Sequence, residues 1–145
     1  MSQAVLPYMK KQSFGIIHNV SSGVGISGFP GIHGYASTKG AIEALTRSLA
    51  LEFKEHNIYV NVMHPPLTNT KSARPLGIPA QMMANPEEVG SKLAKKILST
   101  KKIVTPDLKT SISVFFTRKF PFVIGNLLSK LTEKQKNQTT VSKNS

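Results

Sequence analysis

Two short apolar runs with a long amphipathic segment between them do most to limit what this chain can fold into. Residues 15–20 (GIIHNV) and 58–63 (IYVNVM) have the length and composition of buried strands. Between them, residues 35–55 have the three-or-four-residue spacing of a helix with one apolar stripe, formed by Ile42, Leu45, Leu49 and Phe53. A helix that connects two strands of one sheet makes those strands parallel.

The alternation of strand and helix continues beyond the second strand. The irregular stretch 67–84 has a length typical of functional or disordered loops. A helix is expected to follow, because Asn85 can cap it and Pro86 suits its first turn. Residues 103–105 are a candidate third strand. The sequence therefore predicts an α/β fold with a doubly wound parallel sheet over residues 1–106.

The rest of the chain has a different composition. Residues 107–129 are apolar and basic and are expected to be helical, whereas residues 130–145 are polar and are expected to be disordered. Most of the formal net charge of +12 lies in residues 92–145, which hold twelve Lys or Arg against two Asp or Glu. Such a segment either faces water or lies on an anionic surface, and its phenylalanines suit a membrane interface or packing on the main fold or a second subunit.

Composition also excludes some kinds of site. The chain has no cysteine, so disulfides and cysteine-based zinc sites are excluded. Its four histidines do not have metal-ligand spacing, so no metal is predicted, and His18 is expected to be a satisfied core residue. A charge confined to one third of the chain does not indicate nucleic-acid binding. Residues 1–11 do not have the pattern of a secretory signal, and we expect a cytoplasmic protein that is at most peripheral to a membrane.

Three side chains near the end of the first strand suggest proton chemistry. Tyr35 and Lys39 are four residues apart on the first helix, so their side chains share one face. An ammonium beside a phenol favours the phenolate, which suits the pair to proton transfer. Ser22 follows the first strand, where parallel α/β sheets bind their ligands. On an ordinary helix the same spacing has no function, so the position at the strand end favours a site.

These residues resemble the short-chain dehydrogenase/reductase family. Thirteen positions separate Ser22 from Tyr35, as in the family pattern, and the matching runs are 19–22 (NVSS), Gly28, Pro30, 35–41 (YASTKGA) and 60–65 (VNVMHP). The resemblance implies the C-terminal part of a Rossmann-like domain. It also implies reduction of a ketone or oxidation of a secondary alcohol with NAD or NADP, with a slight preference for NADP.

The resemblance also implies roles for single residues. Tyr35 transfers the proton, Lys39 stabilises the phenolate and binds the nicotinamide ribose, and Ser22 orients the substrate oxygen. Cofactor contacts are implied for Tyr35, Lys39, Pro65, Thr68 and Thr70. The run 65–70 (PPLTNT) is similar to the 3-ketodihydrosphingosine reductase branch, which suggests a lipid-like substrate. Its apolar pocket is then expected to be lined by loop residues, unless these only pack the loop: Leu76, Ile78, Met82 and Met83.

The sequence departs from the family pattern before Ser22. The glycine-rich turn that holds the pyrophosphate, and the residue that selects NAD or NADP, have no match there. We therefore expect a truncated form with an exposed sheet edge and poor solubility in isolation. The alternative function is an inactive half-domain that dimerises or binds a membrane surface. Because the family commonly dimerises through the helix at 35–55, a homo-oligomer is expected in either case.

Overall fold

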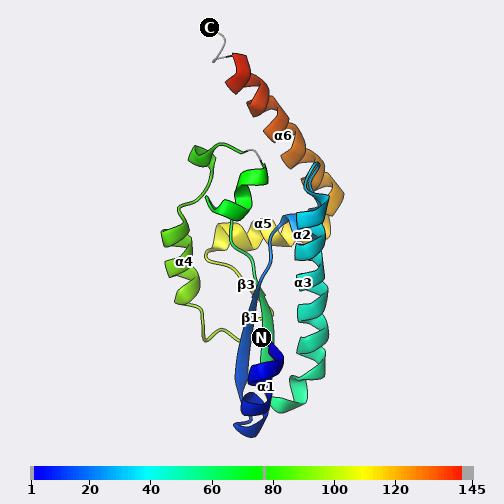
Figure 1. Cartoon of the computed structure of the whole chain (residues 1–145), viewed down its shortest axis with the longest axis vertical. Coiled ribbons are helices and arrows are strands. Elements are labelled where there is room, and N and C mark those ends of the chain that lie inside the picture. The colour runs from blue at the N-terminus through cyan, green and yellow to red at the C-terminus, as the bar shows by residue number, and fades with distance from the viewer. Residues whose placement is uncertain (1, 77, 142–145) are drawn as a thin grey trace.

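The sheet has three parallel strands. The computed structural model describes the backbone of residues 2–76 and 78–141, and the side chains of residues 4–73 and 78–133. Strands β1 (Gly15–Val20), β2 (Ile58–Met63) and β3 (Ile103–Val104) lie in the order β1-β2-β3 (Figure 1). Within the described residues β1 pairs with β2 only, so its other edge is unpaired.

The first two strands are level with one another. Gly15 lies opposite Ile58 and Val20 opposite Met63, so both strands end at the same height. The next residues, Ser21 and His64, therefore leave the sheet side by side. Backbone hydrogen bonds fix both, because Ser21 N donates to Met63 O at 2.9 Å and His64 N donates to Val104 O at 2.9 Å.

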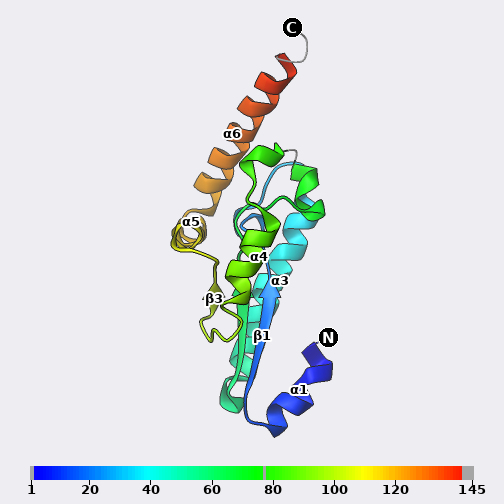
Figure 2. The ribbon, with the colours of Figure 1, turned by 90° about the vertical axis from the view of Figure 1, so that its left-hand side faces the viewer.

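Helices cover the sheet from both sides. Helix α3 (His33–Glu52) connects β1 to β2, and α4 (Pro86–Ala94) connects β2 to β3. The two lie on opposite sides of the strands in Figures 1 and 2, so the predicted doubly wound parallel α/β sheet is confirmed. Helix α4 begins as its sequence predicts, since Asn85 Oδ1 accepts hydrogen bonds from Glu87 N (2.8 Å) and Glu88 N (3.2 Å).

The core lies between α3 and the central strand. Phe53, Ile58 and Val60 are buried together, and partly buried apolar side chains of helix α1 (Ser2–Lys11) pack against them. The predicted stripe on α3 is wrong at Leu45, whose side chain is 52% exposed. The buried residues of α3 are Glu43 and Thr46 instead. They can face the sheet because both have polar partners: Asn19 Nδ2 donates to Thr46 Oγ1 at 3.0 Å, and the Glu43 carboxylate lies beside His64 and Arg118.

Short elements complete this part of the chain. Helix α2 (Val24–Ser27) follows β1, and the 3₁₀ helix η1 (Lys54–His56) follows α3. The predicted loop after β2 contains two further 3₁₀ helices, η2 (Lys71–Leu76) and η3 (Ala80–Met82). His18 has polar partners as expected, because its Nδ1 contacts Asn61 Oδ1 and its Nε2 lies 2.7 Å from Ile97 O, but it is half-buried rather than a core residue.

Two helices form the C-terminal part. Asp107 caps α5 (Leu108–Lys119) by accepting from Thr110 N at 2.8 Å, and α6 (Pro121–Val141) follows directly. Figure 2 shows α5 beyond the β3 side of the sheet and α1 beyond the β1 side. Composition predicted disorder for residues 130–145, but α6 continues to Val141, where Lys, Glu and Gln are good helix formers; residues 142–145 of this prediction lie outside the described residues. Among the described residues, no helix is long and apolar enough to cross a bilayer.

Candidate active site

The structure brings Tyr35 and Lys39 together at the carboxyl end of β1. Both lie near the beginning of α3 on one face, and Lys39 Nζ is 5.7 Å from the centroid of the Tyr35 ring. The same ammonium donates to Val20 O, the last carbonyl of β1, at 3.1 Å. One N–H is used in this way, so two further N–H groups remain for a ligand. The pair therefore lies at the edge where parallel sheets bind ligands.

The two serines after β1 have different surroundings. Ser21 is 2% exposed, and its Oγ donates to Lys39 O at 3.0 Å, which holds α3 on the end of the strand. Ser22 is half-buried, and its carbonyl accepts from Gly25 N at 3.0 Å. The Ser22 hydroxyl makes no hydrogen bond to a residue that the structure describes, Tyr35 included. Ser21 is thus structural, and Ser22 is the serine that a ligand can reach.

The residues after β2 form a folded loop. Pro65 is half-buried, and Thr68 Oγ1 donates to Pro66 O at 2.7 Å. Thr68 also forms a bridge with Ala84, so the loop closes on its own far end. Thr70 is exposed, and its backbone N donates to Thr68 O at 2.8 Å. The structure places these residues beyond the end of β2, and among the described residues no hydrogen bond joins them to Tyr35.

An apolar cluster lies beside Tyr35. Ile32 and Ala73 are buried, and five partly buried side chains pack on them: Val24, Phe29, Tyr35, Ile78 and Met83. Of the predicted pocket residues, Ile78 and Met83 belong to this cluster, whereas Met82 is 52% exposed and does not. The side chain of Leu76 lies outside the described residues. Met83 is therefore a better candidate for a substrate wall than Met82.

Gly25 sets the distance between α2 and the helix that holds Lys39. A Cβ at Gly25 would lie 2.7 Å from both Cβ and C of Lys39, and 2.9 Å from Gly40 N. We expect Gly25→Ala to push α2 away and to lower the free energy of unfolding by about 1–3 kcal/mol, measured by urea denaturation. Gly23→Ala is the control, since nothing lies within 4 Å of its Cβ position. Equal stability of both variants would contradict the close contact.

A buried charged cluster lies one turn beyond Lys39. Glu43 from α3, His64 after β2 and Arg118 from α5 meet there. Glu43 Oε1 is 2.7 Å from His64 Nε2 without an aligned hydrogen bond, Arg118 donates to Glu43 Oε2, and Arg118 Nη2 is 3.3 Å from His64 Nε2. His64 is fully buried. Sequence reasoning missed this cluster, although Tyr35, Lys39 and Glu43 recur at every fourth residue and so share one helix face.

The cluster makes stability depend on pH. Burial raises the pKa of Glu43, but His64 and Arg118 outweigh burial and lower this pKa from 4.5 to about 2. A carboxyl with a lowered folded-state pKa stabilises the fold above its unfolded value and loses that contribution at lower pH. We expect the free energy of unfolding to fall between pH 4.5 and about 2. Glu43→Gln should flatten this decline in urea titrations, whereas Glu52→Gln, an exposed change on the same helix, should not.

The residues at the strand ends fit one half of a dinucleotide. An ammonium with two available N–H groups beside a phenol suits the hydroxyls of a nicotinamide ribose, so Lys39 and Tyr35 would hold that end. In the described residues, the strands are not followed by a glycine-rich turn that opens a helix of eight or more residues, which is the usual pyrophosphate site. The described residues therefore fit the nicotinamide half of a dinucleotide, and the fit does not extend to its pyrophosphate.

Comparison with known proteins agrees with this geometry. The family model for short chain dehydrogenases matches residues 1–79. An uncharacterized oxidoreductase of Thermotoga maritima is 37% identical over 99 residues, which are 67% of this chain and 38% of that protein. The 3-ketodihydrosphingosine reductase of Mus musculus is 44% identical over 69 residues, 48% of this chain and 21% of that protein.

Solved structures agree on the fold. A short-chain dehydrogenase from Sphingobium yanoikuyae in complex with NADPH superimposes with a TM-score of 0.64 at 23% identity, over 81% of this chain and 48% of that one. The chain thus spans less than half the length of these relatives. The family model nevertheless covers more than half of the chain and contains Ser22, Tyr35 and Lys39. The chain belongs to the short-chain dehydrogenase/reductase family.

Proposed function

We propose that this chain carries the proton-transfer half of an NAD(P)-dependent oxidoreductase that reduces a ketone or oxidises a secondary alcohol. One observation carries the proposal: Lys39 Nζ is anchored on Val20 O at 3.1 Å and lies 5.7 Å from the centroid of the Tyr35 ring, at the carboxyl end of β1, the strand that Ser22 follows. Family membership supports an oxidoreductase. The proposed oxidoreductase activity belongs to the whole protein in which Ser22, Tyr35 and Lys39 act.

Each residue of the site has one task in this proposal. Tyr35 gives its phenolic proton to the substrate oxygen during reduction and takes it back during oxidation. Lys39 stabilises the phenolate with its charge and donates to the nicotinamide ribose. Ser22 donates to the substrate oxygen and holds it beside Tyr35. The nicotinamide supplies or accepts the hydride. Pro65, Thr68 and Thr70 would contact the cofactor, the two threonines at its carboxamide and phosphates.

We further propose NADP as the preferred cofactor and a lipid-like ketone as the substrate. The apolar cluster of Ile32, Ala73 and Met83 beside Tyr35 offers a wall for an alkyl chain. The similarity to a reductase of 3-ketodihydrosphingosine supports the same substrate class. We place the protein in the cytoplasm, peripheral to a membrane. Leu45 and Leu51, exposed on α3, support a homo-oligomer formed through this helix.

A second function has one observation in its favour. The described residues offer the nicotinamide half of a dinucleotide site but no glycine-rich turn for the pyrophosphate. If this chain acts alone, its dinucleotide site is incomplete. It would then be an inactive half-domain that dimerises or binds a membrane surface and does not catalyse a reaction.

The two functions differ in a direct assay. The protein, purified from the cells that make it, is incubated with NADPH or NADH and with aliphatic ketones of increasing chain length. Oxidation of the nicotinamide is followed by its absorbance, and cofactor binding by its fluorescence. Turnover that rises with chain length and prefers NADPH is the expected result. Cofactor binding without turnover of any ketone would contradict the enzyme and favour the binding piece.

A further inference from the structure

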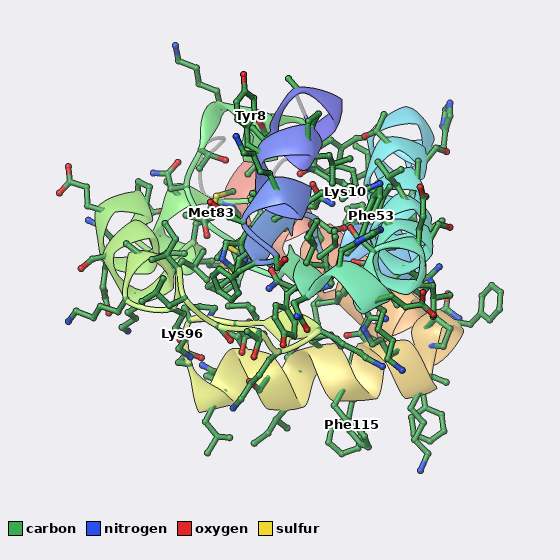
Figure 3. The ribbon with its side chains drawn as sticks, turned by 90° about the horizontal axis from the view of Figure 1, so that it is seen from below. Tyr8, Lys10, Phe53, Met83, Lys96 and Phe115 are labelled. Atoms are coloured by element: carbon green, nitrogen blue, oxygen red, sulfur yellow. The ribbon has the colours of Figure 1, made fainter. Side chains whose placement is uncertain are left out.

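Helix α5 exposes most of its large apolar side chains, unlike a helix that packs on the core of a globular protein. Its buried residues are Thr110, Val114 and Thr117. Its exposed residues include four large apolar side chains, namely Leu108, Ile112, Phe115 and Phe116. Figure 3 shows Phe115 pointing away from the rest of the protein beneath α5. A helix usually buries the apolar face and exposes the polar one, so the exposed face of α5 is suited to contact with something else.

Helix α6 also exposes large apolar side chains. Phe122 is 83% exposed, Val123 is 64% exposed and Leu127 is 52% exposed. Helix α6 is fixed to the fold at Gly125, because a Cβ there would lie 3.1 Å from Ser27 O. We call the exposed side of these two helices the outer face, and define it by Ile112, Phe115, Phe116, Phe122, Val123 and Leu127.

Positive charge surrounds the outer face. Lys109, Lys119 and Lys130 are exposed on the same two helices, and Lys119 Nζ lies 5.5 Å from the centroid of the Phe120 ring. Glu133 is the one acidic residue among residues 108–133. The guanidinium of Arg118 is occupied by Glu43, so the exposed lysines set the charge of this surface. An apolar strip bordered by lysines has the chemistry of helices that lie in a membrane interface.

We propose that the outer face docks on the surface of an anionic lipid bilayer. A bilayer offers an apolar interior to the phenylalanines and negative headgroups to the lysines. A second copy of this chain would cover the apolar strip but would place lysines against lysines, which the charge disfavours. Since no described helix can span a bilayer, the helices lie along the surface.

Docking would bring the candidate active site to the lipid. Arg118 joins α5 to α3 through Glu43, one turn from Lys39, and α6 packs on Ser27 at the end of α2, before the loop that leads to Tyr35. A small pocket of about 130 Å³ lies between that loop and α6, lined by Phe29 and Phe122 among others. The membrane proposal stands on the outer face alone and does not depend on the proposed enzyme activity.

Sedimentation with vesicles tests the proposal. The protein is mixed with vesicles of phosphatidylcholine, with or without phosphatidylserine, and we expect binding to the anionic vesicles that weakens as salt is raised. Phe122→Ser should weaken binding by about tenfold or more. Lys109→Gln combined with Lys119→Gln should weaken it by about 30-fold, since each lysine near the surface contributes about fivefold.

Matched controls lie elsewhere on the surface. Leu98→Ser changes a side chain that is 80% exposed but is not on the outer face, and Lys54→Gln with Lys71→Gln removes two exposed charges. Both should bind like the parent, and circular dichroism should show all variants folded. Equal binding to neutral and anionic vesicles, or equal losses in the controls, overturns the proposal. Absence of vesicle binding, together with an oligomer that Phe122→Ser dissociates, also overturns it and identifies a second copy as the occupant.

Discussion

Tyr35→Phe is expected to lower kcat by about 10²–10⁴-fold, the range contributed by a positioned proton donor. The change removes one hydroxyl, which makes no hydrogen bond to a residue that the structure describes. The ring keeps its place in the cluster with Ile32 and Ala73, so the fold should be retained. The measurement is steady-state reduction of a ketone by NADPH, with unfolding by urea recorded for both proteins.

Tyr59→Phe is the matched control for this prediction. It removes the same hydroxyl from a tyrosine on β2 whose ring lies 6.3 Å from that of Phe14. Its kcat should equal that of the parent. If kcat is unchanged in Tyr35→Phe, another group transfers the proton and the proposed role of Tyr35 is wrong. A fall in kcat that is accompanied by loss of the fold would assign Tyr35 a structural role instead.

Arg118→Ala is expected to lower the free energy of unfolding by about 3 kcal/mol. Its guanidinium pairs with Glu43, whose side chain is 5% exposed, and without it the buried carboxylate keeps His64 and the more distant, exposed Arg47. Breaking a buried ion pair costs about 3–5 kcal/mol, and the side chain of Arg118 is 30% exposed, so the lower end applies. Urea denaturation monitored by circular dichroism measures the effect.

A second arginine provides the control. Arg47 Nη1 lies 3.8 Å from the same Glu43 oxygen, but its side chain is 63% exposed. Arg47→Ala should therefore cost about 0–1 kcal/mol. If Arg47→Ala and Arg118→Ala lower the free energy of unfolding equally, burial does not make the Arg118–Glu43 pair stronger than the Arg47–Glu43 pair.

The partner variants test the coupling between the charges. Glu43→Leu and Arg118→Met each leave one charge without its partner, whereas the double variant removes both. The double variant should be more stable than the sum of the two losses predicts. Additive losses would show that Glu43 and Arg118 do not interact.

The elements with local sequence signals could be predicted. Strands β1 and β2 have the predicted bounds, because each is a short apolar run between breakers. The cap at Asn85 could also be predicted, since its partners, the backbone N–H groups of Glu87 and Glu88, lie only two and three residues along the chain. Helix α3 ends at Glu52, three residues early, because Asn57 adopts the left-handed conformation and closes η1 instead.

The side-chain partners of the site could be predicted only in part. Tyr35 and Lys39 share a helix face, so their spacing placed them together. Glu43 could not be assigned a partner, because Arg118 is 75 residues away along the chain and pairs with it only after α5 has packed. Met83 joins the cluster and Met82 does not. This difference could not be predicted, because the stretch 67–84 has no helical or strand period from which side-chain directions could be inferred.

The pairing of β1 with β2 has a consequence for how the chain folds. The side chains of His18 and Asn61, which face each other across these strands, are 43 residues apart in sequence. Helix α3 lies between them and can form from local contacts, whereas the strands must wait for this long segment to close. During that interval both apolar strands are open to strands of other chains. The rate of closure over α3, rather than the final stability, therefore determines how much of the newly made chain escapes aggregation.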